Sequence, residues 1–180
     1  CYQGLNHNSE NQGRRTMKDI RQVIVPVDFH QHTDDLAEFA IGVANKLEAK
    51  ITFVHVVEKA EYYSDYTVAS SSEIDAELRG YAEKKMSAML EKCKSSCPDC
   101  AGIVLSGDVA DCIIDCAKDK EIDLIIIGTH GAKGIEKIML GSVAERVLKR
   151  AHCPTLVFNP YKGERGYQIT SSISSTVQPI

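Results

Sequence analysis

No apolar run in the sequence approaches the roughly 18 residues that a membrane-spanning helix needs. The N-terminal region also lacks the apolar stretch of a secretory signal peptide. Both absences argue against a protein that enters a membrane or the secretory route. We therefore expect a cytoplasmic protein without a membrane partner.

The sequence also lacks an excess of positive charge. Its 21 lysine and arginine residues are outnumbered by 25 aspartate and glutamate residues, so the formal net charge is −4. Proteins that bind DNA or RNA usually present a basic surface, and this balance argues against a nucleic-acid partner. Any anion that the protein binds must be held by local geometry rather than by overall charge.

The length of 180 residues has room for one domain, and a hydrophobic content of 43% is ordinary for a globular protein. Residues 1–16 are mostly polar and Met17 precedes a strand-like run, so we expect a disordered extension or a cloning remnant there. Residues 162–180 form a polar tail rich in serine and threonine. The expected folded domain is therefore 17–161.

Short β-branched runs alternate with amphipathic segments in this domain. The strand-like runs are 23–27, 51–57, 103–105, 124–127 and 155–158. Such apolar runs favour parallel strands that helices cover on both faces. Five strands separated by four helices predict an α/β fold with a doubly wound, open, parallel sheet, which is a Rossmann-like architecture. Ligands of such sheets bind beyond the carboxyl ends of the strands.

The longest predicted helix follows a loop over 58–69. Ser70 and Glu73 have the spacing of a capping box at its N-terminus. The apolar residues that recur at helical intervals after it are Ile74, Leu78, Tyr81 and Met89. We expect these four to lie on one stripe of the helix.

Glycines with a particular spacing follow the fourth strand. Gly128, Gly131 and Gly141 are separated by two and nine residues, and Ser142 opens the last helix, predicted over 142–150. Glycine allows backbone amides to approach an anion closely, and a helix N-terminus adds unpaired N–H groups. The pattern predicts a phosphate cradle. The alternative is that the glycines only form turns and Ser142 only caps the helix, in a capping box with Glu145.

In several segments, including the glycine pattern, the chain resembles the universal stress protein (UspA) family. The segments that carry the resemblance are 25–29, 54–56, 128–131, 140–148 and 153–157. The likeness covers essentially residues 20–159, and the glycine spacing is that of the ATP-binding class of the family. The resemblance implies a fold of the adenine nucleotide alpha hydrolase type and a bound ATP, ADP or AMP.

The resemblance also implies roles for individual residues. Gly128 would contact the ribose, and Gly131, Gly141 and Ser142, with Val143 adjacent, would hold the phosphates. The residues that would frame the adenine and ribose are Pro26, Val27, Asp28 and Val56. The alternative for Asp28 is a helix-cap or turn aspartate.

The sequence shows few of the features that catalysis at a nucleotide site requires. The Walker A lysine pattern is absent, and no carboxylate is obviously placed to orient a water molecule at a γ-phosphate. His130 lies inside the glycine loop, where a turn histidine is the alternative. We therefore favour a nucleotide-dependent sensor or switch in stress response over an enzyme. The alternative is a slow ATP hydrolase, with Mg²⁺ recruited by the phosphates.

Partner expectations follow from the same resemblance. Family members often dimerise by pairing the last strand across subunits, and Thr155 to Asn159 would supply that edge. We expect a homodimer that passes a nucleotide signal to an unknown protein partner.

The seven cysteines need a separate interpretation. Cys93, Cys97 and Cys100 have a spacing that is compatible with iron–sulfur or zinc ligation, with a redox-sensitive pair, or with reduced surface thiols. Reduced thiols are the favoured interpretation because the total is odd and no signal peptide is evident. A thiol-responsive or metal-responsive stress protein is a second alternative function.

Overall fold

A computed structural model describes residues 19–58, 69–129 and 140–160 of the chain. The elements in chain order are β1 (Gln22–Pro26), α1 (Thr33–Leu47), β2 (Lys50–Val57), α2 (Ala69–Cys93), β3 (Ala101–Ser106), α3 (Val109–Asp119), β4 (Leu124–Gly128), α4 (Ser142–Arg150) and β5 (Thr155–Phe158). The predicted five parallel strands and four helices are confirmed, and each strand begins and ends within two residues of its predicted run. The expected terminal segments 1–16 and 162–180 lie outside the described residues.

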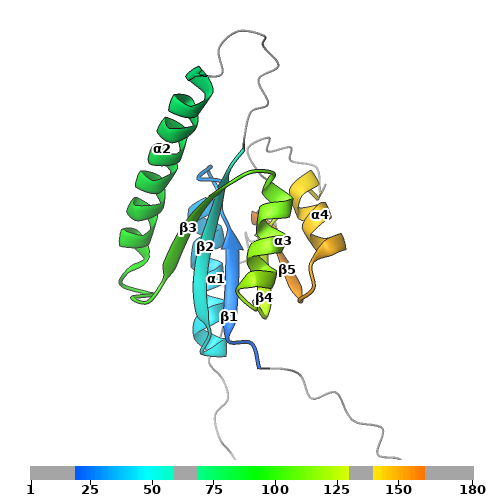
Figure 1. The fold of residues 1–180 in the computed structure, drawn as a ribbon. Helices are drawn as coiled ribbons and strands as arrows, with labels where there is room; N and C mark the ends of the chain where they lie inside the picture. The colour runs from blue at the N-terminus through cyan, green and yellow to red at the C-terminus, as the bar shows by residue number, and fades with distance from the viewer. Residues whose placement is uncertain (1–18, 59–68, 130–139, 161–180) are drawn as a thin grey trace, which may run out of the picture.

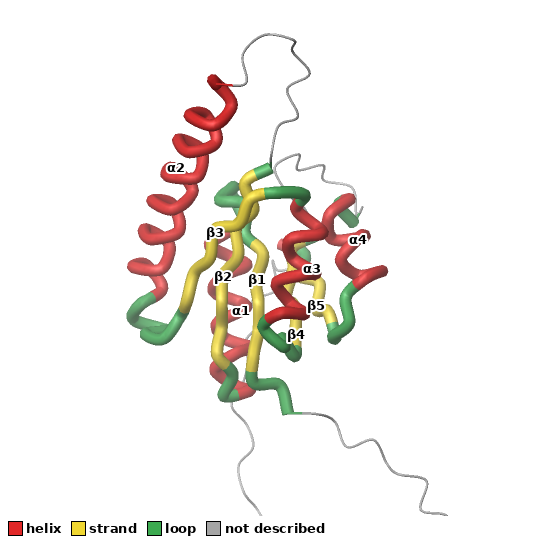
Figure 2. Tube along the Cα trace, viewed as in Figure 1, coloured by secondary structure: helices red, strands yellow, loops and turns green. Residues whose placement is uncertain are grey.

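The five strands form one parallel sheet in the order β3-β2-β1-β4-β5 (Figure 1). Alternate residues of each inner strand point to opposite faces, so Val25 and Ile126 join one apolar cluster while Ile24 and Ile125 join the other. Helices α1 and α2 cover the first face, and α3 and α4 cover the second (Figure 2). The sheet is therefore doubly wound, as the strand composition predicts.

Strand β1 lies at the centre of the sheet, between β2 and β4. After β1 the chain continues outward to β2 and β3, and it then crosses to the other side of β1 to form β4 and β5. Strand β1 is followed by α1 on one face of the sheet, and its neighbour β4 is followed by α4 on the other face. This switch point is where open α/β sheets bind ligands, so the topology alone selects the region to inspect.

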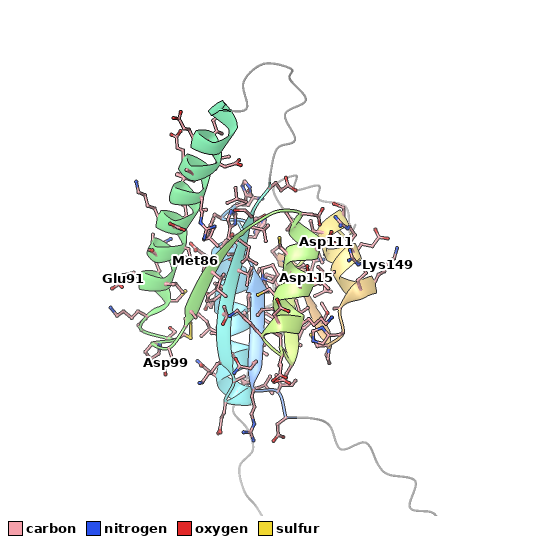
Figure 3. All side chains as sticks on the ribbon, in the orientation of Figure 1. Met86, Glu91, Asp99, Asp111, Asp115 and Lys149 are labelled. Carbon is pink, nitrogen blue, oxygen red and sulfur yellow. A yellow bond between two sulfur atoms is a disulfide. The ribbon has the colours of Figure 1, made fainter. Side chains whose placement is uncertain are left out.

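Helix α2 packs on β3 through its second half. Gly102 of β3 leaves room for Met86, because a Cβ atom on Gly102 would lie 2.5 Å from the Met86 Cγ (Figure 3). The buried apolar residues of the helix are Ala82, Met86 and Met89. The four residues predicted to share one stripe differ in burial, since Met89 is buried whereas Ile74, Leu78 and Tyr81 are 40%, 44% and 60% exposed. They precede the part of α2 that the sheet covers.

The start of α2 also differs from its prediction. The helix begins at Ala69, so Ser70 lies inside the first turn and not at the N-cap that a capping box requires. In the described part of the chain, no helix is both long and apolar enough to cross a membrane.

Candidate functional site

The carboxyl end of β1 is held by the neighbouring strand β2. Val27 is buried, and its backbone N–H donates a 2.8 Å hydrogen bond to the Val54 carbonyl oxygen. Its own carbonyl oxygen lies 2.8 Å from Nδ1 of the His55 ring. The strand end is therefore bonded through both backbone groups of Val27, although β1 itself ends at Pro26.

Asp28 follows this strand end and organises the turn into α1. Its Oδ1 accepts hydrogen bonds from the backbone N–H of His30 at 3.0 Å and from the Thr33 hydroxyl at 3.1 Å. Thr33 is the first residue of α1 and is buried. Both bonds are those of a turn aspartate, so the structural alternative for Asp28 is present in the fold. A ligand hydroxyl would have to bond to the other carboxylate oxygen, Oδ2.

His55 has a role that the sequence does not reveal. The register of β2 against β1 places it beyond Val54, which is opposite Pro26. Its ring contacts the Phe29 ring in a tilted arrangement, with centroids 4.4 Å apart. Phe29 has a positive φ of 59°, which few non-glycine residues adopt. The His55 ring thus supports both the Val27 carbonyl and the strained residue after Asp28. Local spacing predicts only a packed strand residue here, because strand pairing is not local.

The carboxyl end of β4 is joined directly to the start of α4. Thr129, which follows Gly128, donates its backbone N–H to the Phe158 carbonyl oxygen of β5 at 2.8 Å. Its carbonyl oxygen accepts the backbone N–H of Gly141 at 2.8 Å. Two segments that are twelve residues apart are thereby held together. The glycine pattern predicted that they cooperate, and the structure brings them into contact.

Gly141 is the N-cap of α4, and the contact leaves little space for a side chain there. A Cβ atom on Gly141 would lie 3.1 Å from the Thr129 carbonyl oxygen, which is backbone and cannot turn aside. The first helical bond runs from the Glu145 N–H to the Gly141 carbonyl oxygen at 2.9 Å. Of the four N–H groups that a helix start leaves without helical partners, the Gly141 N–H is used by Thr129. Those of residues 142–144 remain at the helix terminus.

The alternative interpretation of Ser142 and Glu145 as a capping box of α4 does not fit the structure. The N-cap is Gly141 rather than Ser142, and it makes no side-chain capping bond. Glu145 instead accepts a 2.6 Å hydrogen bond from Lys149, and this bond lowers the pKa of the Glu145 carboxyl group. Because Glu145 is directed toward the body of the helix, the exposed Ser142 hydroxyl and the first-turn amides have no capping carboxylate from this helix.

The other predicted site residues are distributed around the same sheet edge. Gly128 ends β4, and Val56 is buried near the end of β2. Val143 packs partly into the core below the first turn of α4. Gly131 and His130 lie outside the described residues. Every described member of the predicted set is therefore at the carboxyl side of the sheet, and the switch point separates the β1 group from the β4 group.

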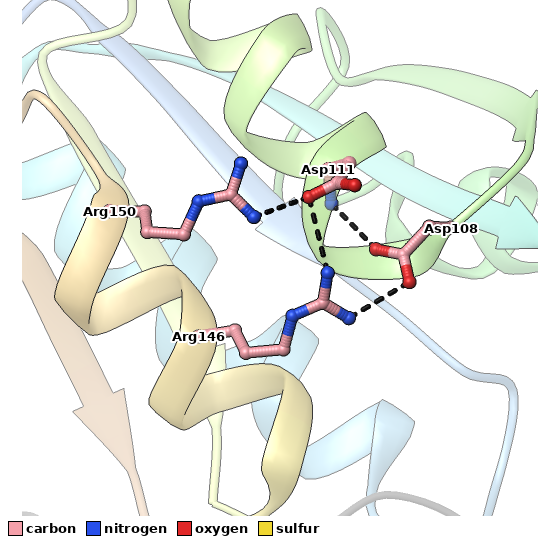
Figure 4. A network of polar contacts seen from close by, with 4 residues as sticks. All are labelled: Asp108, Asp111, Arg146 and Arg150. Atoms are coloured by element: carbon pink, nitrogen blue, oxygen red, sulfur yellow. Dashed lines mark hydrogen bonds and ion pairs between the residues drawn. The ribbon is translucent and has the colours of Figure 1, made fainter.

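A charged network links α4 to the start of α3 (Figure 4). Asp108 is the N-cap of α3 and accepts the Asp111 N–H at 3.0 Å. Arg146 donates to Asp108 at 2.8 Å and to Asp111 at 3.2 Å, and Arg150 also bonds to Asp111. The hydrogen bond from Arg146 is the largest cause that lowers the pKa of Asp108 to about 2. The sequence pattern did not predict this network, since its partners are 35 to 39 residues apart.

The cysteine cluster lies elsewhere, between α2 and β3. Cys97 and Cys100 form a disulfide bond, so the favoured interpretation of reduced thiols is wrong for this pair. Cys93 has a free thiol whose pKa is raised, mainly by burial. Among the residues that the structure describes, no group of three histidine, cysteine, aspartate or glutamate side chains is placed to bind a metal ion.

Comparison with known proteins agrees with the fold. The Universal stress protein family model matches residues 19–159. Universal stress protein MJ0531 of Methanocaldococcus jannaschii is 31% identical over 144 residues, which cover 80% of this chain and 85% of that protein. The structure of universal stress protein UspA from Lactobacillus plantarum superposes with a TM-score of 0.70 at 24% identity, covering 78% of this chain and 99% of that one.

A third similar structure has a ligand in its description. It is the universal stress protein from Archaeoglobus fulgidus in complex with dAMP, with a TM-score of 0.56, 20% identity, and coverage of 78% of this chain and 98% of that one. At this identity the likeness concerns the fold. The family model spans nearly all of the described residues, and the relative from M. jannaschii matches over most of its own length. The chain belongs to the universal stress protein family.

Proposed function

We propose that the protein binds an adenine nucleotide, ATP in its signalling form, at the switch point between β1 and β4, and acts as a nucleotide-dependent switch. The observation that carries the proposal is the start of α4. The N-cap of α4 is Gly141, which makes no side-chain capping bond. Its backbone N–H holds the start of the helix against the Thr129 carbonyl oxygen. A helix N-terminus of this kind binds phosphate because its amides and its dipole both favour negative charge.

The phosphates would bind to the first turn of α4. The backbone N–H groups of residues 142–144 and the Ser142 hydroxyl would be the donors, and Gly141, which carries no Cβ atom, allows the start of α4 to lie close to Thr129. Gly131 completes the proposed cradle, and Gly128 would contact the ribose. A Mg²⁺ ion, where one is bound, would be held by the phosphates themselves. The net charge of −4 does not oppose this because the donors are local.

The nucleoside would lie along the end of β1. Pro26, Val27 and Val56 offer an apolar surface for the adenine, and Asp28 Oδ2 would accept a hydrogen bond from a ribose hydroxyl or the adenine amino group. The bonds from His30 and Thr33 hold the Asp28 carboxylate in one orientation before any ligand binds. Such preorganisation lowers the entropy cost of binding.

The relative from A. fulgidus that is described in complex with dAMP supports an adenine nucleotide as the ligand. A slow ATP hydrolase is the alternative, but the described residues supply no catalytic group that favours it. Thr155, Leu156 and Val157 form most of β5, an edge strand, and we propose that this edge pairs two copies of the chain in a homodimer. A conformational change on nucleotide binding would then be passed on to the surface where the two copies meet at β5.

The direct test measures nucleotide content and affinity. Protein purified without added nucleotide is denatured, and the released compounds are identified by mass spectrometry. Nucleotide-free protein is then titrated calorimetrically with ATP, ADP, AMP and GTP. We expect adenine nucleotides to bind at least about tenfold more tightly than GTP. The proposal would be contradicted if no adenine nucleotide is released and none binds in the titration.

A matched pair of glycine variants locates the site. Gly141→Val should reduce ATP affinity by at least about thirtyfold, because a Cβ atom would press on the Thr129 carbonyl oxygen at 3.1 Å. Gly80→Val is the control, since a Cβ atom on Gly80 in α2 meets no atom within 4 Å. Single-turnover measurement of ADP formation by both variants separates a switch from an enzyme. Hydrolysis in wild type that is lost in Gly141→Val would favour the hydrolase.

A further inference from the structure

A second reactive feature lies far from the nucleotide region. The segment between α2 and β3 contains the sequence Cys97-Pro98-Asp99-Cys100, and its two cysteines form a disulfide bond. This segment precedes β3 and therefore lies at the amino side of the sheet, opposite the carboxyl ends where the glycines gather. Figure 3 shows Asp99 below the C-terminal part of α2, on the opposite side of the view from Asp111 and Lys149.

We propose that Cys97 and Cys100 form a reversible redox site that exchanges disulfide bonds with small thiols of the cysteinyl-peptide class. In the reducing direction, one thiolate of the small thiol attacks one protein sulfur, forms a mixed disulfide and releases the other cysteine as a thiolate. A second small thiolate then attacks the mixed disulfide. The products are a protein dithiol and the oxidised small-molecule disulfide, so two electrons and two protons enter the protein.

The position of the bond in the chain argues against a purely structural role. The two cysteines are only three residues apart. Because the stabilisation by a disulfide grows with the length of the loop that it closes, this bond constrains the unfolded chain little. Cys97 and Cys100 pack at the margin of the apolar cluster that α2 and β3 share, whereas the close contact of Met86 with Gly102 does not involve the disulfide. The fold can therefore tolerate opening of the bond.

The surroundings of the bond give a small thiol access to it. Cys97 and Cys100 are half-buried and line an open pocket of about 290 Å³ together with Leu90, Pro98 and Lys94. This volume lies at the lower limit of ligand pockets, which favours a small molecule. Lys94 and Glu91 pair at 3.3 Å on the same pocket, and both are exposed. Their opposite charges suit a ligand that carries both a carboxylate and an ammonium group, as cysteinyl peptides do.

The electrostatic environment favours the oxidised form. The Cys97 N–H donates a 2.9 Å bond to the Cys93 carbonyl oxygen at the C-terminal end of α2, where the helix dipole is negative. The Asp99 carboxylate lies between the two cysteines in sequence, and the charge of Lys94 is offset by Glu91. Neither feature stabilises a thiolate. A reduced pair that lacks such stabilisation is readily reoxidised, so the site is suited to sensing an oxidised thiol pool.

The nearby thiol of Cys93 does not interfere with this exchange. Burial is the first cause that raises its pKa, and the Asp34 carboxylate adds to the effect. Asp34 is itself paired with Lys92 at 3.3 Å. Since the thiolate is the nucleophile in exchange, Cys93 remains protonated and attacks the disulfide slowly. The pair is therefore expected to react as a unit, with Cys93 as a spectator.

The test is a redox titration of the full-length chain. Protein is equilibrated anaerobically in buffers with graded ratios of reduced to oxidised glutathione, quenched with acid, unfolded and alkylated. Peptide mass spectrometry then gives the fraction of Cys97 and Cys100 that is alkylated. We expect both residues to change together along one two-electron curve, without loss of far-ultraviolet circular dichroism. A disulfide that reduces only after the protein unfolds would overturn the proposal, as would a pair that oxidised glutathione leaves fully reduced.

Single-cysteine variants test the mechanism. Cys100→Ser and Cys97→Ser should each form a stable mixed disulfide with glutathione, because the resolving thiol is missing. Cys93→Ser is the control and should keep the wild-type titration curve. If Cys93→Ser shifts or abolishes the titration curve, the assignment of the redox site to Cys97 and Cys100 is contradicted. The wild-type titration decides the question by itself if a variant fails to fold, and ATP affinity measured on the same samples reports separately on the nucleotide site.

Discussion

Helices α3 and α4 begin at the same edge of the sheet and differ in how their N-termini are completed. Asp108 caps α3 from within the chain, and its carboxylate also receives Arg146 (Figure 4). Gly141 begins α4 without any side-chain capping bond, and Glu145 is paired along the helix with Lys149. Among the described residues, a carboxylate thus caps the start of α3 and none caps the start of α4. The start of α4 is therefore the one that is available to a phosphate.

The largest effect is expected when a carboxylate is placed at the start of α4. Ser142→Asp places a carboxylate in the first turn, where it interacts favourably with the helix dipole but repels phosphate. We expect ATP affinity to fall by at least about thirtyfold while the melting temperature stays equal or rises. Ser142→Asn is the control, because asparagine has the size of aspartate without its charge, and this variant should bind ATP within about threefold of wild type. Calorimetric titration and thermal melting measure both effects, and equal affinities of the two variants would refute the role of the α4 terminus.

The converse change removes the internal anion from α3. Asp108→Ala deletes the cap and leaves Arg146 with one carboxylate partner, so the melting temperature should fall by a few degrees. ATP affinity should remain within about threefold, because α3 is not proposed to hold phosphate. Asp115→Ala, an exposed aspartate of the same helix, is the control and should melt like wild type. A large loss of ATP binding in Asp108→Ala would show that the two helix starts act together.

The pH dependence of stability sharpens the same contrast. Asp108 has a pKa of about 2 in the folded protein, below the ordinary aspartate pKa of 3.8, so the folded state binds its proton less readily than the unfolded state. The stabilisation is therefore present above about pH 4 and is lost as the pH falls toward 2. Urea unfolding midpoints of wild type and Asp108→Asn should differ at about pH 5 and converge near pH 2. A gap that persists at the lower pH would mean that Asp108 acts through contacts other than its charge.

The smallest expected effect concerns salt. Binding at α4 relies on backbone N–H groups in direct contact with the phosphate, so it is screened less than binding by exposed lysine or arginine side chains. ATP affinity should change by less than about threefold between about 0.05 and 0.5 M NaCl at constant free Mg²⁺. Repeated titrations measure this. A steep decrease with salt would transfer the main role to basic side chains.

Much of the fold could be predicted because its determinants are local. The apolar runs of β1, β2 and β4 are nearly continuous, and their residues are buried on both faces of the sheet. Helix α4 begins and ends as predicted, at Ser142 and Arg150. Apolar spacing did not predict burial along α2, because Ile74 and Leu78 have helical periodicity but no surface to cover them. Periodicity reports which residues share a face and not what lies opposite that face.

The candidate site was predictable in part for the same reason. Gly128, Gly141 and Ser142 were found from spacing, and the switch-point topology gathers them with Asp28 at one edge. His55 was missed as a support of this edge, since its bond to the Val27 carbonyl oxygen joins residues 28 apart. The disulfide between Cys97 and Cys100 was one of several open interpretations. Spacing alone does not distinguish a thiol pair from metal ligands.

The apolar runs that become the five strands, the bounds of α4 and the glycines that follow β4 are all readable in the amino-acid sequence, because each depends on neighbours within a few residues. Only the tertiary structure decided how the helix starts are completed. The cap of α3 receives an arginine from α4, and the start of α4 is held by Thr129, so both outcomes depend on residues that are distant in sequence. Hydrogen bonds are satisfied by whichever partner the fold brings within reach, and that partner is set by topology.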